Sequence, residues 1–122
     1  IIVALGHEYA GTFCTHDEFW QQMERASRVT GDQLWRMPLD KEWQKAMKSD
    51  FADIQNLSKA PGAGSCTAAG FLQYFIDEDR TWAHIDIAGT AWRKSEKPTC
   101  PKYASGFGVR VLDRLIADNY ES

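Results

Sequence analysis

The sequence predicts an α/β fold, in which a sheet is flanked by helices. Segments with the two-residue period of a strand alternate along the chain with segments that carry the apolar stripe of an amphipathic helix. The clearest strand is residues 81–88, where Ala83, Ile85 and Ile87 form an apolar face opposite a mixed one. The clearest helix is residues 16–29. With 122 residues, the chain is long enough for one domain or part of one.

The first segment is residues 1–5 (IIVAL), an unbroken apolar run that predicts a strand buried on both faces of a parallel sheet. Gly6 ends this strand, and residues 6–13 (GHEYAGTF) are expected to form a loop. Chain termini usually lie at the surface with polar neighbours. A chain that opens inside a buried strand is therefore expected to be the C-terminal part of a longer protein.

A helix is expected over residues 16–29. Thr15 and Glu18 have the spacing of a capping box, in which the two side chains satisfy each other's free backbone donors. Gly31 should end the helix. Its predicted apolar stripe consists of Phe19, Trp20, Met23, Ala26 and Val29.

The middle of the chain contains shorter segments. Residues 34–39 (LWRMPL) should be extended as far as Pro38, and residues 41–47 can form two helical turns. Residues 48–61 show no sustained period and read as a long loop, and loops of this length are often functional. A helix should begin among the small residues 62–69 and run to about residue 76, with apolar side chains around much of its circumference.

The strand at residues 81–88 is followed by Gly89, which permits a turn at the strand's C-terminal end, where open α/β sheets bind ligands. A loop with a basic patch (Arg93, Lys94, Lys97 and Lys102) is expected over residues 90–105. The last helix should cover residues 106–118, with a core face of Val111, Leu112, Leu115 and Ile116.

Bulk composition argues against several classes of function. A net charge of −3 gives no electrostatic basis for binding nucleic acid or anionic membranes. The sequence has no apolar run of about 20 residues and no signal peptide, so we expect a cytoplasmic protein. Cys14, Cys66 and Cys100 are odd in number and widely spaced, which favours reduced thiols over disulfides or a zinc site.

Two side-chain groups are candidates for chemistry. His84 and Asp86 lie on one strand face and could hold a metal with His7 and Glu8, but two ligands are weak evidence, and a hydrogen-bonded buried pair is the favoured interpretation. Cys14 could act as a nucleophile with a histidine as its base, and Cys66 could be activated at a helix start. A buried, unreactive thiol is favoured for Cys66.

Residues 62–64 (GAG) precede the predicted helix and invite comparison with a phosphate-binding loop. They lack the Lys-Ser/Thr pair of a nucleotide loop and the full dinucleotide fingerprint. Tight packing of the helix on the sheet is the favoured interpretation of these glycines. The basic patch is most simply a solvated surface, although it could meet a neighbouring subunit.

Four runs together resemble one protein family. They are TGDQLWRMPL (30–39), SDFADIQNLSKAPGAGSCTAAGFLQYF (49–75), WAHIDIAGTAW (82–92) and YASGFGVRVLDRLI (103–116). In order and spacing they are similar to the C-terminal segment of the catalytic domain of the leucyl aminopeptidase (cytosol aminopeptidase) family. The resemblance covers nearly all of residues 1–122 and implies part of a mixed α/β sheet flanked by helices.

The family releases N-terminal amino acids, leucine-like ones preferred, from peptides with two divalent metal ions, manganese or zinc. Its metal ligands, and the arginine of its Asn-Thr-Asp-Ala-Glu-Gly-Arg motif, have no counterpart in this sequence and precede this segment in the family's order. The resemblance therefore implies no catalytic residue and no metal ligand here. By itself, the segment is expected to be inactive.

What the resemblance assigns to this segment is a wall of the substrate pocket. Ala88 and Ala91 match positions that line the pocket for the N-terminal side chain, and Leu57 matches an apolar contact for the following residue. Simple packing is the alternative for the two alanines. Members of the family are hexamers, which implies a homo-oligomer. From a different class, the alternative function is a non-catalytic binding or assembly module that kept the fold.

Overall fold

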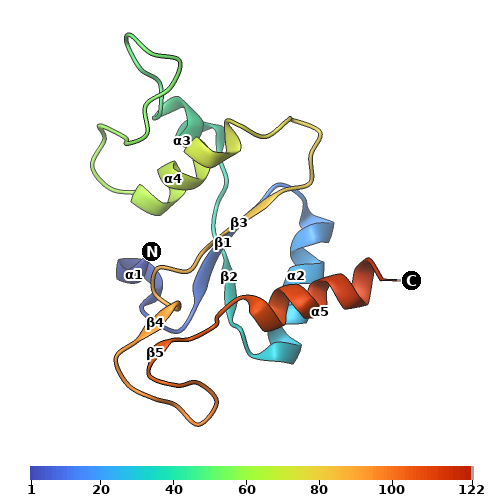
Figure 1. The fold of residues 1–122 in the computed structure, drawn as a ribbon. Coiled ribbons are helices and arrows are strands. Elements are labelled where there is room, and N and C mark those ends of the chain that lie inside the picture. Colours follow the sequence, from blue (N-terminus) through green and yellow to red (C-terminus); the bar gives the residue numbers. More distant parts are fainter. Residues whose placement is uncertain (122) are drawn as a thin grey trace.

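The computed structural model describes residues 1–121, and its centre is a mixed three-stranded sheet (Figure 1). The middle strand, β1 (Ala10–Cys14), pairs in parallel with β2 (Leu34–Arg36) and antiparallel with β3 (Ala83–Asp86). A separate two-stranded antiparallel sheet is formed by β4 (Trp92–Arg93) and β5 (Tyr103–Ala104). The predicted mixed sheet is confirmed.

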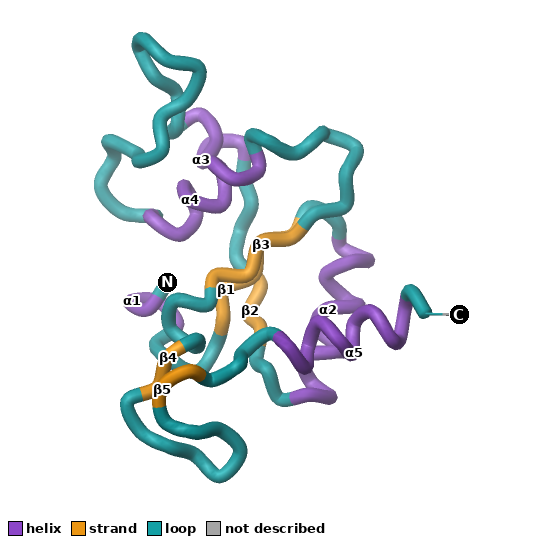
Figure 2. The backbone as a smooth tube through the Cα atoms, in the orientation of Figure 1, coloured by secondary structure: helices purple, strands orange, loops and turns teal. Residues whose placement is uncertain are grey.

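Helices lie on both faces of this sheet, as the tube in Figure 2 shows. On one face, α2 (Asp17–Thr30) packs against α5 (Val109–Asn119), and on the other, α3 (Lys41–Lys45) packs against α4 (Gly64–Gln73). A one-turn helix, α1 (Ile2–Leu5), begins the chain. The described part of the chain contains no helix with the length and apolar character that crossing a bilayer requires.

Each face of the sheet has its own core because successive side chains of β1 point in opposite directions. Ala10 and Cys14 face α2 and α5, where the buried cluster also contains Met23, Ala26, Leu34, Val111 and Leu115. Phe13 faces α3 and α4 and packs with Cys66, Ala69, Met37, Leu39 and Trp43. The result is a three-layer arrangement of helix, sheet and helix.

The alternation predicted for the strand at residues 81–88 is confirmed. Ala83 and Ile85 pack into the cluster under α2 and α5. His84 lies on the other face, against Phe13. The strand itself is shorter than predicted and ends at Asp86, where the chain enters a turn.

The prediction of a strand at residues 1–5 is wrong. Residues 2–5 form α1, and Val3 is fully exposed on it. A run of five apolar residues has no period that separates a strand from a short helix, so the pattern fits both. The expectation that the chain opens inside a buried strand loses its basis.

The prediction of a loop at residues 6–13 missed the central strand. All five residues of β1 are buried, since the strand has a neighbour on each edge and helices on each face. Gly11 allows a close contact there, since a Cβ atom would lie 2.3 Å from Cδ1 of Ile1, and the Ile1 side chain would have to move. Gly11 and Thr12 are typical of loops, which is why the segment was predicted as one. In the structure, their small size allows close packing in a strand that is covered on both edges and both faces.

Helix α2 begins and ends near the predicted residues, although the capping box is wrong. The Oγ1 atom of Thr15 accepts a hydrogen bond from the N–H of Trp82 at 2.9 Å, so this side chain joins β1 to β3 instead of capping the helix. Gly31 ends the helix in the left-handed conformation, as predicted. Phe19, Trp20, Met23 and Ala26 face the core, whereas Val29 is exposed.

Helices α4 and α5 are less buried than the sequence suggests. In α4, the buried residues form one side and Leu72 is exposed, as is Phe75 just beyond the helix. The tight packing predicted for the glycines at residues 62–64 is wrong, because a Cβ atom at Gly62 or Gly64 would meet nothing within 4 Å. The glycine that packs closely is Gly70, where a Cβ atom would lie 2.8 Å from the backbone of Trp43 in α3. In α5, Leu112 and Ile116 of the predicted core face are half exposed.

Candidate functional site

The turn that follows β3 carries two of the predicted substrate-contacting residues. Asp86 accepts a hydrogen bond from the N–H of Ala88 through Oδ1, at 3.1 Å. The N–H groups of Thr90 and Ala91 both donate to the carbonyl of Ile87, at 3.0 and 2.8 Å. These bonds fold residues 86–91 into a tight turn at the C-terminal end of the strand.

Two neighbouring segments hold this turn in place. The Nδ1 atom of His7 lies 2.7 Å from the carbonyl oxygen of Gly89. Gly89 itself is buried, and a Cβ atom there would lie 2.2 Å from the carbonyl oxygen of Gly6. On the other side, Ser105 donates from its N–H to the carbonyl of Ala91 and from Oγ to the carbonyl of Thr90, at 3.0 and 2.6 Å. The turn is therefore a rigid feature of the fold.

On this rigid turn, Ala88 is exposed and Ala91 is half-buried. Their methyl groups are the smallest apolar surface that a side chain can present. A turn with this composition can form a wall that leaves room for a bulky apolar group beside it. Within residues 1–121, no neighbouring element covers the side chain of Ala88.

Leu57 lies in the long loop between α3 and α4, and 78% of its surface is exposed. The N–H of Gln55 donates to the carbonyl of Met47 at 2.9 Å, which ties this part of the loop to the end of α3. Leu57 lines a hollow of about 270 Å³ with Met47, Asn56, Ser58, Ala60, Gly62, Gly64, Thr67 and Ala68.

The lining of that hollow comes from the loop and the start of α4, whereas Ala88 and Ala91 belong to the turn after β3. The structure therefore presents the predicted contacts as two separate surfaces within the described residues. Their assignment to one substrate pocket stays a prediction.

His84 and Asp86 do not form the hydrogen-bonded pair that the sequence favoured. The imidazole of His84 is stacked near the rings of Phe13 and Trp82, with centroid distances of 5.9 and 6.4 Å. Burial lowers the pKa of His84, and the charge of Asp86 opposes this only in part. The ring therefore acts as a neutral member of an aromatic stack, while Asp86 caps the turn.

The described residues do not fit a metal centre. Within residues 1–121, no three side chains of the histidine, cysteine, aspartate and glutamate types come close enough to share an ion. Glu8, a candidate ligand in the sequence, pairs with Lys97 at 2.6 Å. Arg93, largely buried, lies 4.0 Å from the same carboxylate. Two members of the basic patch therefore contact Glu8, and the patch is only partly a solvated surface.

The two candidate nucleophiles are buried thiols. Burial raises the pKa of Cys14 and of Cys66. The Sγ atom of Cys14 donates to the carbonyl of His16 at 3.2 Å. A raised pKa lowers the thiolate fraction at neutral pH, so these groups do not have the properties of catalytic cysteines.

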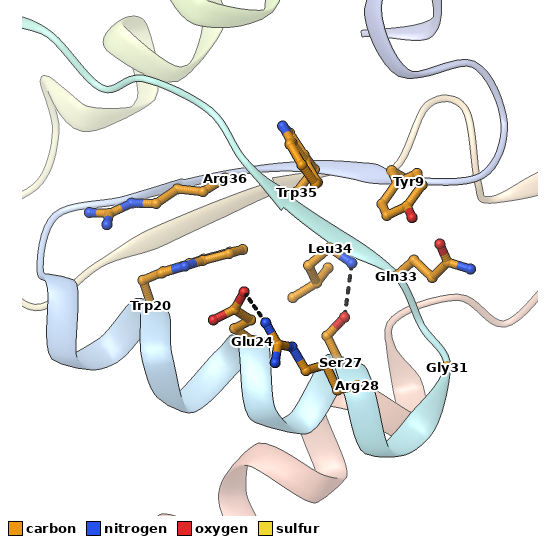
Figure 3. Close-up of a pocket in the computed structure, with 10 residues that line it drawn as sticks. All are labelled: Tyr9, Trp20, Glu24, Ser27, Arg28, Gly31, Gln33, Leu34, Trp35 and Arg36. Atoms are coloured by element: carbon orange, nitrogen blue, oxygen red, sulfur yellow. Dashed lines mark hydrogen bonds and ion pairs between the residues drawn. The ribbon is translucent and has the colours of Figure 1, made fainter.

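A feature that the sequence reasoning missed is a groove of about 620 Å³ along β2 (Figure 3). Trp20, Glu24, Ser27 and Arg28 of α2 border it on one side, and Tyr9 and Trp35 border it on the other. The signal in the sequence is the two-residue period of LWR, which places Trp35 opposite the buried Leu34.

Comparison with known proteins connects this fold to a family. Residues 1–113 match the family model described as "Cytosol aminopeptidase family, catalytic domain". The chain belongs to the cytosol aminopeptidase family. The resemblance seen in the sequence is thereby confirmed over almost its whole length.

Individual family members agree with this assignment. A probable cytosol aminopeptidase of Rhodopseudomonas palustris (strain BisB18) is 49% identical over all 122 residues, and a cytosol aminopeptidase of Rickettsia prowazekii (strain Madrid E) is 45% identical over 97% of the chain. This chain spans about a quarter of the length of each, 24%. Among solved structures, a mutant of tomato leucine aminopeptidase has a TM-score of 0.86 and 36% identity, covering 97% of this chain and 22% of its own.

Proposed function

We propose that this chain is the C-terminal segment of the catalytic domain of a two-metal aminopeptidase, which releases N-terminal amino acids from peptides. The observation that carries the proposal is the match of residues 1–113 to the catalytic domain of the family. The chain's share of its relatives' length, about a quarter, fits a segment of such a domain. In this proposal residues 1–122 supply core and pocket wall, and the remaining parts of the enzyme supply the chemistry.

Ala88 and Ala91 form the wall beside the substrate's N-terminal side chain. The support for this role is the turn itself, which is held on both sides by His7 and Ser105 and presents small apolar groups. A fixed wall of small residues leaves space for a leucine-like side chain and excludes water from it. Leu57 offers an exposed apolar contact for the next residue of the peptide.

The two divalent ions, manganese or zinc, are bound by polypeptide outside this chain. The donor set described above gives no three-residue cluster for an ion within residues 1–121, so we derive no catalytic step through these residues. We expect the enzyme to be cytoplasmic, as the name of the relatives suggests. The family resemblance further implies assembly as a homohexamer.

A chimera tests this function. The 122 aligned residues of the Rhodopseudomonas relative are replaced by this chain, and hydrolysis of leucine 4-nitroanilide is measured with manganese. We expect the chimera to keep hydrolytic activity, because the proposed segment performs the same structural task in both proteins. A chimera that folds and assembles like the relative but does not hydrolyse the anilide would contradict the proposal.

The chain alone provides the complementary assay. Incubated with the same anilide and manganese, residues 1–122 should release no nitroaniline above a blank that contains metal only. Turnover above that blank would show that residues 1–122 carry out the hydrolysis themselves, which contradicts the proposal. An inactive chimera together with a stable, well-folded chain would favour the alternative, a non-catalytic binding or assembly module.

A further inference from the structure

The short segment between α1 and β1 lies against the turn that carries Ala88 and Ala91 (Figure 1). Gly6 approaches so closely that a Cβ atom at Gly89 would lie 2.2 Å from the carbonyl oxygen of Gly6. The next residue, His7, has its Nδ1 atom 2.7 Å from the carbonyl oxygen of Gly89. Both sides of this contact belong to the described residues, so it is complete without any other part of the enzyme.

The conformation of Gly6 brings His7 to the turn. Helix α1 ends with a hydrogen bond from the N–H of Gly6 to the carbonyl of Ile2, at 2.8 Å. Gly6 then takes a φ of 61° and a ψ of −136°, which glycine adopts far more readily than other residues. The imidazole thereby reaches Gly89 across 82 positions of sequence, from backbone that is fixed to α1.

The partner of His7 determines which ring nitrogen carries the proton. A carbonyl oxygen can only accept a hydrogen bond, so Nδ1 must be the donor, and Nε2 has no proton when the ring is neutral. The carbonyl belongs to Gly89, which is buried and lies between Ala88 and Ala91 in the turn. Because an unpaired buried carbonyl is unfavourable, we expect the turn to shift when this donor is removed.

The supports of the turn differ in kind. At its C-terminal end, the carbonyl of Ala91 accepts from the backbone N–H of Ser105 at 3.0 Å, a bond that any residue other than proline can make. At Gly89, the donor is a side chain, so the bond depends on the identity of residue 7. Substitution at position 7 can therefore move the middle of the turn while the backbone bond at its end remains.

We propose that His7 is a positioning residue for substrate selection. Its Nδ1–H holds the carbonyl of Gly89 and thereby sets how close Ala88 and Ala91 lie to the N-terminal side chain of the peptide. The inference rests on the proposed function, in which these two alanines form the pocket wall. His7 acts through the backbone of the turn and not through contact with the peptide.

The chimera with the Rhodopseudomonas relative tests this role through the ratio of kcat/KM for leucine 4-nitroanilide to that for alanine 4-nitroanilide. In His7→Leu we expect the ratio to fall about threefold or more, the effect of one lost hydrogen bond, because the longer side chain contacts more of the wall. His16→Leu is the matched control, since His16 is also exposed but precedes α2, and its ratio should not change. An equal loss of activity toward both substrates in His7→Leu would contradict the proposal.

Two further substitutions test the geometry of the donor. The amide nitrogen of asparagine is bonded to Cγ, as Nδ1 of histidine is, so His7→Asn should keep the ratio within about twofold of the wild type. In His7→Gln the amide nitrogen lies one bond further out, and the ratio should stay as low as in His7→Leu. Equal ratios in the asparagine and leucine variants would refute the role of Nδ1.

The variant Ala91→Met separates this inference from the proposed function. If Ala91→Met lowers the ratio and His7→Leu does not, the wall is supported and the role of His7 is refuted. If Ala91→Met leaves the ratio unchanged in an active chimera, the wall itself is contradicted, and the role of His7 with it.

The tautomer of His7 gives a readout that does not depend on activity. Nitrogen-15 NMR of the chain at about pH 9, where imidazole side chains are neutral, should show the His7 ring protonated at Nδ1. A ring protonated at Nε2 and without a proton at Nδ1 could not donate to Gly89, and this result would overturn the proposal.

Discussion

Asp32, in the loop after α2, lies 2.7 Å from the guanidinium of Arg110 on α5. Its carboxylate also accepts hydrogen bonds from the N–H groups of Gly108 and Val111, at 3.2 and 3.3 Å. One buried side chain thus caps the start of α5 and joins that helix to the loop preceding β2.

Replacing this carboxylate should destabilise the fold. Asp32 is 2% exposed, so Asp32→Ala leaves two backbone donors without their partner, and we expect a loss of about 2–3 kcal/mol in the free energy of unfolding. Arg110→Ala is the control. Its side chain is 55% exposed, so the loss should be below about 1 kcal/mol. Urea denaturation compares the two variants, and equal losses would contradict the capping role.

Gly89→Ala should disturb the turn that carries Ala88 and Ala91. The added Cβ atom would meet the carbonyl oxygen of Gly6 at 2.2 Å, so the two backbone segments must separate, and we expect a loss of about 2 kcal/mol or more in unfolding free energy. Gly64→Ala, at the start of α4, has open space around it and should be neutral or stabilising by up to about 1 kcal/mol. Thermal unfolding of both variants decides the comparison, and similar shifts would contradict the close approach at Gly89.

Stability should depend on pH through His84. Burial lowers the pKa of this imidazole from its ordinary value of 6.5. As pH falls below about 6.5, the unfolded chain gains a proton that the folded chain does not, so the folded state loses stability, by at most about 1.4 kcal/mol per pH unit. The loss ends once pH passes below the pKa of the folded state. Above pH 6.5 this residue contributes no slope.

The variant His84→Phe isolates this contribution, because a phenyl ring can replace the imidazole beside Phe13 and Trp82. The difference in unfolding free energy between pH 7 and pH 5 should be smaller in the variant than in the wild type. Direct titration of the His84 ring by NMR gives the pKa of the folded state. A value at or above 6.5 would contradict the buried, neutral ring.

The three thiols should react at different rates. Cys100 is partly exposed, whereas Cys14 and Cys66 are buried and have raised pKa values. With Ellman's reagent at neutral pH, we expect one fast equivalent, assigned to Cys100 by its loss in Cys100→Ser. The other two should react only after the chain is unfolded. Any fast equivalent in the native Cys100→Ser chain would show that Cys14 or Cys66 is reactive.

Periodicity correctly predicted the elements whose side chains divide into two faces. The apolar stripe of α2 is confirmed except for the exposed Val29, and the alternation of β3 is confirmed, because the apolar faces of both elements pack into the same cluster. Glycine and proline signals correctly placed the end of α2 and the long loop that contains Leu57. These features depend on local sequence, which is why they could be read without the structure.

Elements that depend on contacts distant in sequence could not be predicted in this way. β1 is a strand because β2, β3 and four helices surround it, and its own residues are too small and too mixed to show a period. The hydrogen bonds from His7 and Ser105 that hold the Ala88 turn could not be predicted either, because these residues lie far from the turn in sequence. The resemblance to the family identified Ala88, Ala91 and Leu57, but local pattern gave no measure of how they lie in space.

The substrate specificity of the chimera with the Rhodopseudomonas relative tests the pocket wall most directly. Ala91→Met should fill the space beside the N-terminal side chain, so the ratio of kcat/KM for leucine 4-nitroanilide to that for alanine 4-nitroanilide should fall about tenfold or more. Val109→Met, at an exposed position of α5, should leave the ratio unchanged. An unchanged ratio in Ala91→Met, with activity retained, would contradict the claim that this chain forms the side-chain-sensing wall of an aminopeptidase.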